Sequence, residues 1–448
     1  MVVGRLTQAL NRPVDAASVA AFRIAFGAML LVSTIRFFGH GWVREFYAVP
    51  THFFSYWRGA WVRPLPLVGM YALYALIAVA AACLMLGIAS RAAAAVGALC
   101  FGYAHFCDKA NYLNHYYLIT LLLALLAFLA VDREFSLRTW LSPAERRGQV
   151  RAWVLYLLRF QIGVVYFFGG VGKLNADWLL HAEPLRIWLS ANAELPVLGW
   201  ILAERWAAYL FSWCGALFDL SIVPLLLFRR TRVLAYALVV VFHVLTAMLF
   251  RIGMFPWVMI VSATIFCSPE WPRHVLARLR RRAAAHPAGV AGVPIGKKSG
   301  LLAAIYLTTQ TLLPLRCALY PGNTLWSEEG FRFAWRVMLI EKAGSLDFEV
   351  VDRAGRRYAV SPGQYLTHFQ ARMAATQPDM ILELAHFIAR DFAQRGLGPV
   401  RVYADSEVSF NGRLRQRMID PARDLASVSD GLAPKPWILP APTAAPAF

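Results

Sequence analysis

Charged residues are scarce in this sequence of 448 residues: Asp, Glu, Lys and Arg make up 16% of it, whereas hydrophobic residues make up 59%. Soluble domains usually contain about 25% charged and about 45–50% apolar residues, so this composition excludes an ordinary soluble protein and indicates a membrane protein. Acidic residues are the scarcer kind of charge, and the formal net charge is +19. Because the basic residues lie mostly in short loops between apolar runs, they indicate membrane topology and not a nucleic-acid-binding surface.

Several motifs that would assign a chemistry are also missing. The six cysteines form no CxxC pair and show no metal-ligand spacing, so we expect no metal site and interpret most of them as small buried hydrophobes. The first residues contain no short apolar region followed by a small-residue cleavage site, so the first span is expected to insert directly. The glycines of FFGGVG (167–172) match no GxxxxGK[ST] pattern and follow no strand. They favour close helix packing or space for a flat apolar ligand.

Long apolar runs are what the sequence has in abundance. About 17–25 apolar residues cross a hydrocarbon core of roughly 30 Å. Nine runs approach that length: 17–38, 67–88, 92–106, 115–131, 152–172, 205–228, 232–250, 254–268 and 300–315. With the N-terminus inside, the inner loops carry more than twice as many Lys and Arg residues as the outer loops, which fits the positive-inside rule. We therefore predict a polytopic α-helical membrane protein of about nine transmembrane helices with a cytoplasmic N-terminus.

The C-terminal region is far less apolar and is predicted to form a small extracytoplasmic α+β domain. FEVVDRAGRRYAV (348–360) alternates like a β-hairpin with Gly355 near its turn, and residues 400–410 are typical of another strand followed by a basic turn. Residues 376–395 have apolar residues at helical spacing, and Gly396 is a suitable terminator. We predict three parts: a transmembrane helical domain (1–315), the α+β domain (316–430) and a Pro/Ala-rich tail (431–448) that is extended or disordered.

Ionisable residues lie at the ends of the apolar runs or within them. Such a group at membrane depth is costly and suggests function. Lys173 ends the apolar part of YFFGGVGKLNADW (166–178), where it could be a charge anchor or a reactive base. His243 could be a hydrogen-bonded core residue, a haem ligand or a binding residue, and Asp219 could be a carboxylate that only joins helices. The aromatic side chains around Lys173 suit a quinone or prenyl ligand.

Five ordered blocks resemble one known family. They are YLNHYYL (112–118), YFFGGVGKLNADW (166–178), FHVLTAMLFRIGMFPWVMI with IFCSPEWPR (242–273), LPLRCALYPGNTLWSEEGFRFAWRVM (313–338) and VYADSEVSFNGRLRQRMIDPARDL (402–425). In these blocks the chain resembles bacterial homologues of vitamin K-dependent γ-glutamyl carboxylase, within the horizontally transferred transmembrane domain (HTTM) proteins. The resemblance implies an enzyme integral to the bacterial cell membrane.

The resemblance implies a lyase that converts Glu of a protein or peptide to γ-carboxyglutamate, a post-translational modification, with reduced vitamin K or menaquinol, O2 and CO2. A weak base first takes a proton from the hydroquinone. Oxygenation then yields a far stronger base that removes the Glu γ-proton, the carbanion captures CO2, and the quinone leaves as its epoxide. A lysine whose ammonium form is disfavoured by burial suits the first step. The implied partners are an exported peptide or protein carrying Glu, the membrane quinone pool and a quinone epoxide reductase, with no nucleic acid.

By position, the resemblance assigns the hydroquinone base to Lys173 and the pair beside the quinone oxygens to Asn114 and His115. Further residues are implied to bind quinone or substrate: His243, Tyr166, Asp177 and Trp178, together with Trp335 and Met338 in the glutamate-binding segment FAWRVM (333–338). No metal is expected in this site.

Three positions depart from the family's pattern. Gly172 stands where animal members have a second lysine, Arg336 replaces an Asp, and Ile340 replaces a His. The quinone half of the site is thus better preserved than the peptide half. Two alternatives stay open: a quinol epoxidase of the same fold without glutamate carboxylation, and a non-catalytic membrane transporter or scaffold.

Overall fold

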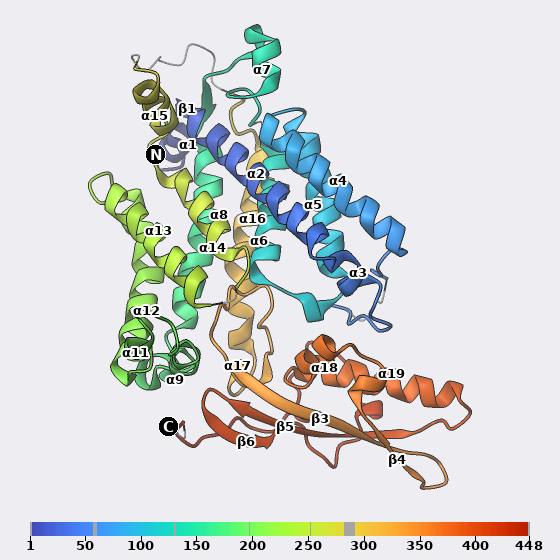
Figure 1. Cartoon of the computed structure of the whole chain (residues 1–448). Coiled ribbons are helices and arrows are strands. Elements are labelled where there is room, and N and C mark those ends of the chain that lie inside the picture. The colour runs from blue at the N-terminus through green and yellow to red at the C-terminus, as the bar shows by residue number, and fades with distance from the viewer. Residues whose placement is uncertain are drawn as a thin grey trace.

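The computed structural model describes residues 2–56, 61–129, 131–196, 198–250, 252–281 and 292–446. A bundle of long helices stands over an antiparallel sheet, and α18 (His368–Ala374) and α19 (Pro378–Gln394) lie on the side of the sheet nearest the bundle (Figure 1). The long helices are α2 (Ala17–Gly39), α4 (Leu67–Leu86), α5 (Ser90–Phe106), α6 (Asn114–Phe128), α8 (Ala152–Gly172), α12 (Arg205–Leu227), α13 (Arg232–Leu249), α14 (Phe255–Ala263) and α16 (Lys297–Leu315).

Helices form at all nine predicted runs, but they do not all have the length of a span. In the described part of the chain, six are long and apolar enough to cross a membrane: α2, α4, α8, α12, α13 and α16 with its continuation to Leu319. The 15 residues of α6 rise about 22 Å, which is short of a hydrocarbon core of roughly 30 Å. α14 with its continuation to Phe266 is shorter still. The structure supports a polytopic membrane protein, but it does not support the count of nine spans.

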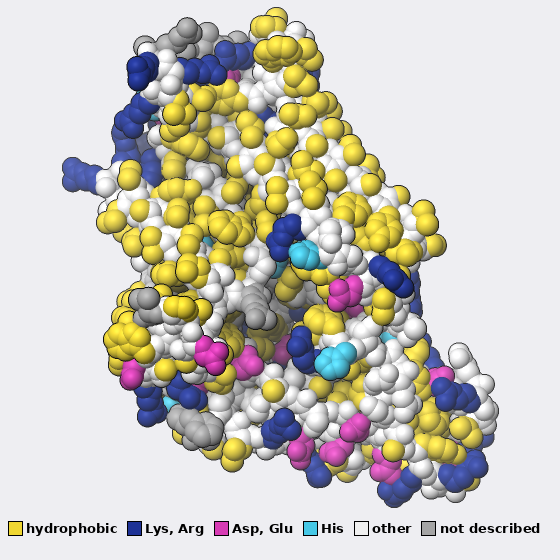
Figure 2. All heavy atoms as spheres, viewed as in Figure 1, with side chains coloured by type: hydrophobic (Ala, Val, Ile, Leu, Met, Phe, Trp, Pro, Cys, Tyr) yellow, Lys and Arg dark blue, Asp and Glu magenta, His cyan; other side chains and the backbone are white. Residues whose placement is uncertain are grey.

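The surface of the bundle is apolar where the long helices run. Hydrophobic side chains cover the flank of the bundle, whereas charged side chains gather at its far end and over the sheet (Figure 2). Such a distribution suits a body whose middle faces lipid, because charged groups are costly in hydrocarbon.

The sheet has four antiparallel strands in the order β4 (Arg357–Val360), β3 (Lys342–Val351), β5 (Arg401–Phe410) and β6 (Arg413–Arg417). Three predictions are confirmed: the hairpin at 348–360, the helix now seen as α19, and the strand at 400–410. Gly355 and Gly396 have φ of +79°, as a hairpin turn and a helix end require. One prediction is wrong, because only Asn411 and Gly412 form the turn after β5. The residues that follow pair with β5 as a charged edge strand, which discourages pairing with other chains.

The Pro/Ala-rich tail is extended and packed in its described part. Trp437 is buried, and the Leu439 N–H donates to the Met418 carbonyl at 2.8 Å. The indole N–H of Trp326 donates to the Leu439 carbonyl at 2.8 Å. These bonds hold the tail against the sheet domain.

Ion pairs at two places help to fasten the sheet domain to the bundle. Lys109, in the turn after α5, places its Nζ 3.1 Å from Asp379 and 2.8 Å from Glu383 of α19. On the other side, the carboxylate of Asp177 in α9 (Ala176–His181) accepts hydrogen bonds from Arg413 at 2.5 and 2.9 Å. The sheet domain is therefore docked at the ends of both α5 and α8.

His52 is expected to make this contact between the bundle and the sheet domain sensitive to pH. Its ring lies between Phe54 and Phe387, at centre distances of 4.8 and 4.6 Å. Burial lowers the pKa of His52 from 6.5 to about 4, against a smaller opposing effect of Glu383. Because the unfolded chain binds this proton more readily, stability is expected to fall as pH drops through the interval between the two values.

We expect the melting temperature of the purified protein to fall over that interval, and to fall less in a His52→Phe variant, which keeps the ring contacts without the titration. Thermal melts of both proteins across the pH range measure the difference. If the melting temperatures of the two proteins fell equally over this interval, a group other than His52 would be responsible for the pH dependence.

Candidate functional site

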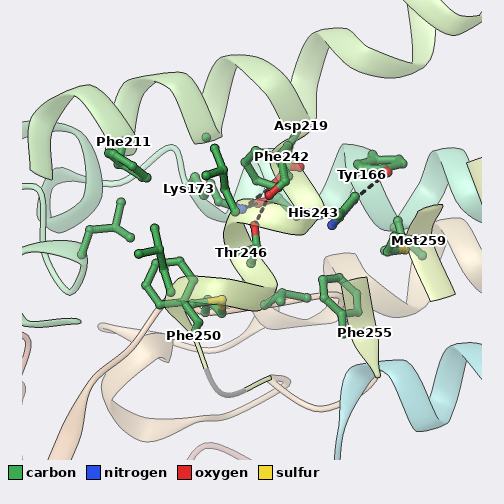
Figure 3. A pocket seen from close by; sticks show the side chains of 18 of the residues that line it. Tyr166, Lys173, Phe211, Asp219, Phe242, His243, Thr246, Phe250, Phe255 and Met259 are labelled. Carbon is green, nitrogen blue, oxygen red and sulfur yellow. Dashed lines mark hydrogen bonds and ion pairs between the residues drawn. The ribbon is translucent and has the colours of Figure 1, made fainter. Parts of the chain in front are cut away.

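A largely apolar cavity of about 110 Å³ lies in the bundle at the end nearest the sheet domain. α8, α12, α13 and α14 wall it, and residues 337–338 complete it from the sheet side (Figure 3). Five polar side chains enter it: Tyr166, Lys173, Asp219, His243 and Thr246. The remaining wall is rich in aromatic rings: Trp178, Phe211, Phe242, Phe250 and Phe255.

Lys173 follows the last turn of α8 and directs its side chain into the protein. Its Nζ lies 2.5 Å from Asp219 Oδ2 on α12 and donates to the Gly169 carbonyl at 3.3 Å. Both residues of the pair are buried, with exposures of 7% and 8%. This geometry contradicts the interpretation of Lys173 as a surface anchor. It leaves the interpretation as a reactive base open and adds a partner, because Lys173 is one half of a buried pair.

Two glycines let α8 and α12 approach closely enough for that pair. A Cβ on Gly170 would lie 2.8 Å from the side chain of Leu220, and a Cβ on Gly169 would lie 3.4 Å from Asp219 Oδ2. A side chain at Gly170 would therefore push α12 away. Gly169 also lines the cavity, so the glycine run serves both helix packing and space in the cavity.

His243 on α13 has one ring nitrogen bonded and one free. Its Nε2 lies 2.9 Å from the hydroxyl of Tyr166. Its Nδ1 is buried and has no hydrogen-bond partner among the described residues. A buried polar atom without a partner costs about 1–3 kcal/mol and calls for an explanation such as a ligand. In Figure 3 this nitrogen points away from Tyr166, into the space between Thr246 and Met259.

The segment FAWRVM (333–338) enters the bundle from the sheet side. Trp335 is fully buried and stacks on Tyr117 of α6 at a ring-centre distance of 4.9 Å. Phe333, Trp335 and Met338 have φ of +61°, +55° and +54°. A non-glycine residue in the left-handed region costs roughly 1–2 kcal/mol. Strain of this kind concentrates at functional sites, where the surrounding structure holds it in place.

A second cavity of about 660 Å³ lies between the bundle and the sheet domain. Its walls come from the turn after α5, from residues 328–344, and from α18 and β6. Figure 2 shows the surface hollowed where the two parts meet. Among the described residues, Met338 alone lines both cavities. The strained segment therefore forms the partition between an apolar space and a larger polar one.

Basic side chains dominate the second cavity: Lys109, Arg332, Arg336, Lys342, Arg372 and Arg415 line it, against Glu328 and Glu341. Burial alone would raise the pKa of Asp379 beside it, but Arg332 at 2.6 Å and Lys109 at 3.1 Å hold that pKa well below its usual range. Burial lowers the pKa of Lys342, against the opposing effect of Glu328 at 2.7 Å. Such walls attract anions.

The structure gathers five of the predicted residues in one place. Lys173, His243, Tyr166, Trp178 and Met338 all line the apolar cavity. The ring centre of Trp178 lies 5.3 Å from Lys173 Nζ. These five residues come from three separate blocks of the sequence.

Asn114 and His115 do not join that cluster. Asn114 lines the second cavity, where its Nδ2 donates to the backbone carbonyl of Arg336 at 3.1 Å. His115 lies beside Phe255, at a ring-centre distance of 6.2 Å. Phe255 lines the apolar cavity, but His115 does not. The predicted quinone pair is thus divided between two environments.

Two further predicted residues line neither cavity. Trp335 belongs to the core of the bundle, and the carboxylate of Asp177 is bound by Arg413 of the sheet domain. The residue that sequence reasoning left undecided is Asp219, whose position in an apolar run was the available signal. Sequence reasoning also missed Arg372 and Arg415, which line the second cavity. No sequence pattern marks them, because isolated arginines are common in a basic chain.

Comparisons with known proteins match both parts of the chain. The HTTM domain family matches residues 11–271, which is more than half of the chain. The lumenal domain of vitamin K-dependent gamma-carboxylase matches residues 297–444. No solved structure matches the chain. The described residues contain no group of three or more His, Cys, Asp or Glu side chains that could hold a metal ion.

Proposed function

Because the chain belongs to the gamma-carboxylase-like family of HTTM-domain proteins, we propose that it couples oxygenation of a reduced naphthoquinone with carboxylation of Glu in an exported peptide or protein. The observation that carries this proposal is the position of Met338, between an apolar cavity with a buried Lys–Asp pair and a larger basic cavity. Each cavity has the chemistry that one half-reaction needs.

The apolar cavity is proposed to receive the ring of reduced vitamin K or menaquinol. The aromatic wall accepts a flat ring, the unpaired Nδ1 of His243 can bond a quinol oxygen, and Lys173 with Asp219 supplies a place for a proton. Bound there, the quinol would supply, on reaction with O2, a base far stronger than any side chain. The protein's own base then has only to remove the proton of a quinol hydroxyl, and not that of the Glu γ-carbon.

The Lys173–Asp219 pair is the proton acceptor in this proposal. A charged ammonium has no lone pair to accept with. In this proposal one proton moves along the 2.5 Å contact from Nζ to Oδ2, which leaves the amine of Lys173 uncharged. The neutral amine of Lys173 can then take the quinol hydroxyl proton. The resulting ammonium and His243 stabilise the anion that remains.

The second cavity is proposed to hold the Glu-bearing peptide. Its basic walls favour carboxylates. Met338 stands where the Glu γ-carbon would meet the apolar cavity, and the bond from Asn114 to the Arg336 carbonyl holds the partition in place. A buried meeting point keeps water from quenching a strong base before it reaches the carbon.

We further propose an arrangement in the bacterial cell membrane with a cytoplasmic N-terminus and an extracytoplasmic sheet domain. A match to a family of lumenal domains supports that side for the sheet. This arrangement needs an odd number of crossings, so α5, α6 and α14 are proposed to cross beside the six longer helices, although α6 and α14 are shorter than a hydrocarbon core. A quinone epoxide reductase in the same membrane would regenerate the quinol.

The test uses the full chain in lipid nanodiscs with reduced menaquinone or vitamin K, O2, bicarbonate and a Glu-containing peptide. Chromatography and mass spectrometry are expected to detect both quinone epoxide and carboxylated peptide. Epoxide without any carboxylated peptide would favour the quinol epoxidase, an alternative supported by Arg336 and Ile340 in the wall of the second cavity. Formation of neither product would contradict the proposal and favour a transporter or scaffold.

A further inference from the structure

Three arginines of the second cavity have no acidic partner in the described part of the chain: Arg336, Arg372 and Arg415. Arg336 donates one hydrogen bond, to Thr324 Oγ1 at 2.9 Å. Arg372 and Arg415 are exposed, and the guanidinium of Arg372 lies 5.9 Å from the ring centre of Phe369. All three guanidinium groups are therefore available to a ligand.

The other basic side chains of the cavity are already paired with acids. Lys109 pairs with Glu383 at 2.8 Å, and Lys342 pairs with Glu328 at 2.7 Å. The second acid of the wall, Glu341, accepts a hydrogen bond from the indole of Trp188 at 2.6 Å. Glu341 keeps its charge in that bond, so it is one acid of the wall set against three unpaired arginines, and the cavity keeps an excess of positive charge.

The size of the cavity exceeds what one Glu side chain needs. Its 660 Å³ falls within the roughly 300–1,000 Å³ of pockets that bury whole drug-sized ligands. The three arginines come from three elements: Arg336 from the partition segment, Arg372 from α18 and Arg415 from β6. Arginine is also the side chain best suited to carboxylates, because its planar fork donates two parallel hydrogen bonds.

We propose that this cavity recognises an acidic peptide segment, in which further Asp or Glu residues flank the Glu that reaches Met338. The inference rests on the proposed function for the identity of the reacting Glu. Recognition of the peptide depends only on the attraction between its carboxylates and the three arginines. Arg336 lies two residues before Met338 and would hold the nearest carboxylate. Arg372 and Arg415 are more exposed and would hold carboxylates farther along the peptide.

The experiment measures binding without quinol, so that it does not depend on activity. A short fluorescent peptide with a central Glu flanked by Asp residues is compared with a counterpart flanked by Asn, by anisotropy with the full chain in zwitterionic nanodiscs. The Asp peptide is expected to bind about tenfold tighter, because each exposed ion pair contributes up to about a factor of five. Raising the salt from about 0.05 to about 0.5 M should remove most of the difference, since salt screens exposed charges.

Charge-removing variants locate the recognition. Arg372→Gln and Arg415→Gln are each expected to lower the preference a few-fold, and the triple variant that adds Arg336→Gln is expected to abolish it. The matched control is Arg353→Gln, an exposed arginine in the hairpin between β3 and β4 that lines neither cavity, and it should leave the preference unchanged.

Equal binding of the two peptides, no binding of either, or a preference that survives the triple variant would each overturn the inference. A preference that depends on the arginines but comes without carboxylation would support the inference and count against the proposed function instead.

Discussion

A Lys173→Met variant is expected to lose quinol oxygenation by at least about a hundredfold, because a positioned general base contributes roughly 10²–10⁴-fold. The same change leaves Asp219 as a buried carboxylate without its partner. Breaking a buried ion pair costs about 3–5 kcal/mol, so the variant is also expected to be much less stable. Loss of activity in this variant alone would therefore not separate chemistry from folding.

Two companion variants make that separation. In the double variant Lys173→Met with Asp219→Leu, both charges are gone, so stability is expected to return while quinol oxygenation stays absent. In Lys173→Arg the pair with Asp219 can persist, but arginine does not release its proton. We expect that variant to be stable and inactive.

Epoxide formation and thermal melts, measured on the same preparations, check these expectations. Near-normal epoxide formation by Lys173→Arg would show that a positive charge suffices at this position. In that case Asp219, and not Lys173, would be the proton acceptor.

A Met338→Ala variant is expected to uncouple the two half-reactions. Met338 lines both cavities, so removing its side chain opens the partition while leaving Lys173 and His243 in place. Epoxide should still form, but the yield of carboxylated peptide per epoxide should fall roughly tenfold to a hundredfold, the size of effect produced by misplacing reacting groups. The neighbouring Val337 lines only the apolar cavity and provides a matched control.

The measurement is the ratio of carboxylated peptide to epoxide in one reaction. Val337→Ala is expected to change both products together, so that the ratio stays constant. If Met338→Ala also kept the normal ratio, the partition would have no part in coupling, and the two cavities would communicate by another route.

The sequence predicts the fold well where the pattern is local. Apolar runs place the nine helices, and Gly355 and Gly396 place a turn and a helix end. The number of spans is less predictable. Apolar residues show where a helix forms, but they do not show whether a helix of only 15 residues, such as α6, crosses the bilayer. The edge strand after Gly412 could not be predicted from its charged residues, because such residues are typical both of a solvated turn and of a protected sheet edge.

The candidate site shows the limit of position-by-position reasoning. Asn114 and His115 are neighbours in the sequence, but successive residues of a helix point about 100° apart, so they enter different environments. The same holds for Asp177, bound by the sheet domain, and Trp178, which lines the apolar cavity.

The pairing of Lys173 with Asp219 has no local signal either. The two residues are 46 positions apart. Their contact depends on how closely α8 and α12 pack at Gly170, which no short motif encodes. A buried carboxylate can be recognised in a sequence, but its partner becomes evident only from the packing of the helices.

The most direct test of a link between the two cavities follows hydrogen at the Glu γ-carbon. A peptide deuterated at that carbon is given to the full chain with reduced menaquinone and O2, while CO2 is withheld. Release of deuterium to water should require both quinol and O2, and should be absent in Lys173→Arg. Epoxide formation without any release of deuterium, or release that continues without quinol, would contradict the coupling of quinol oxygenation to proton removal from Glu.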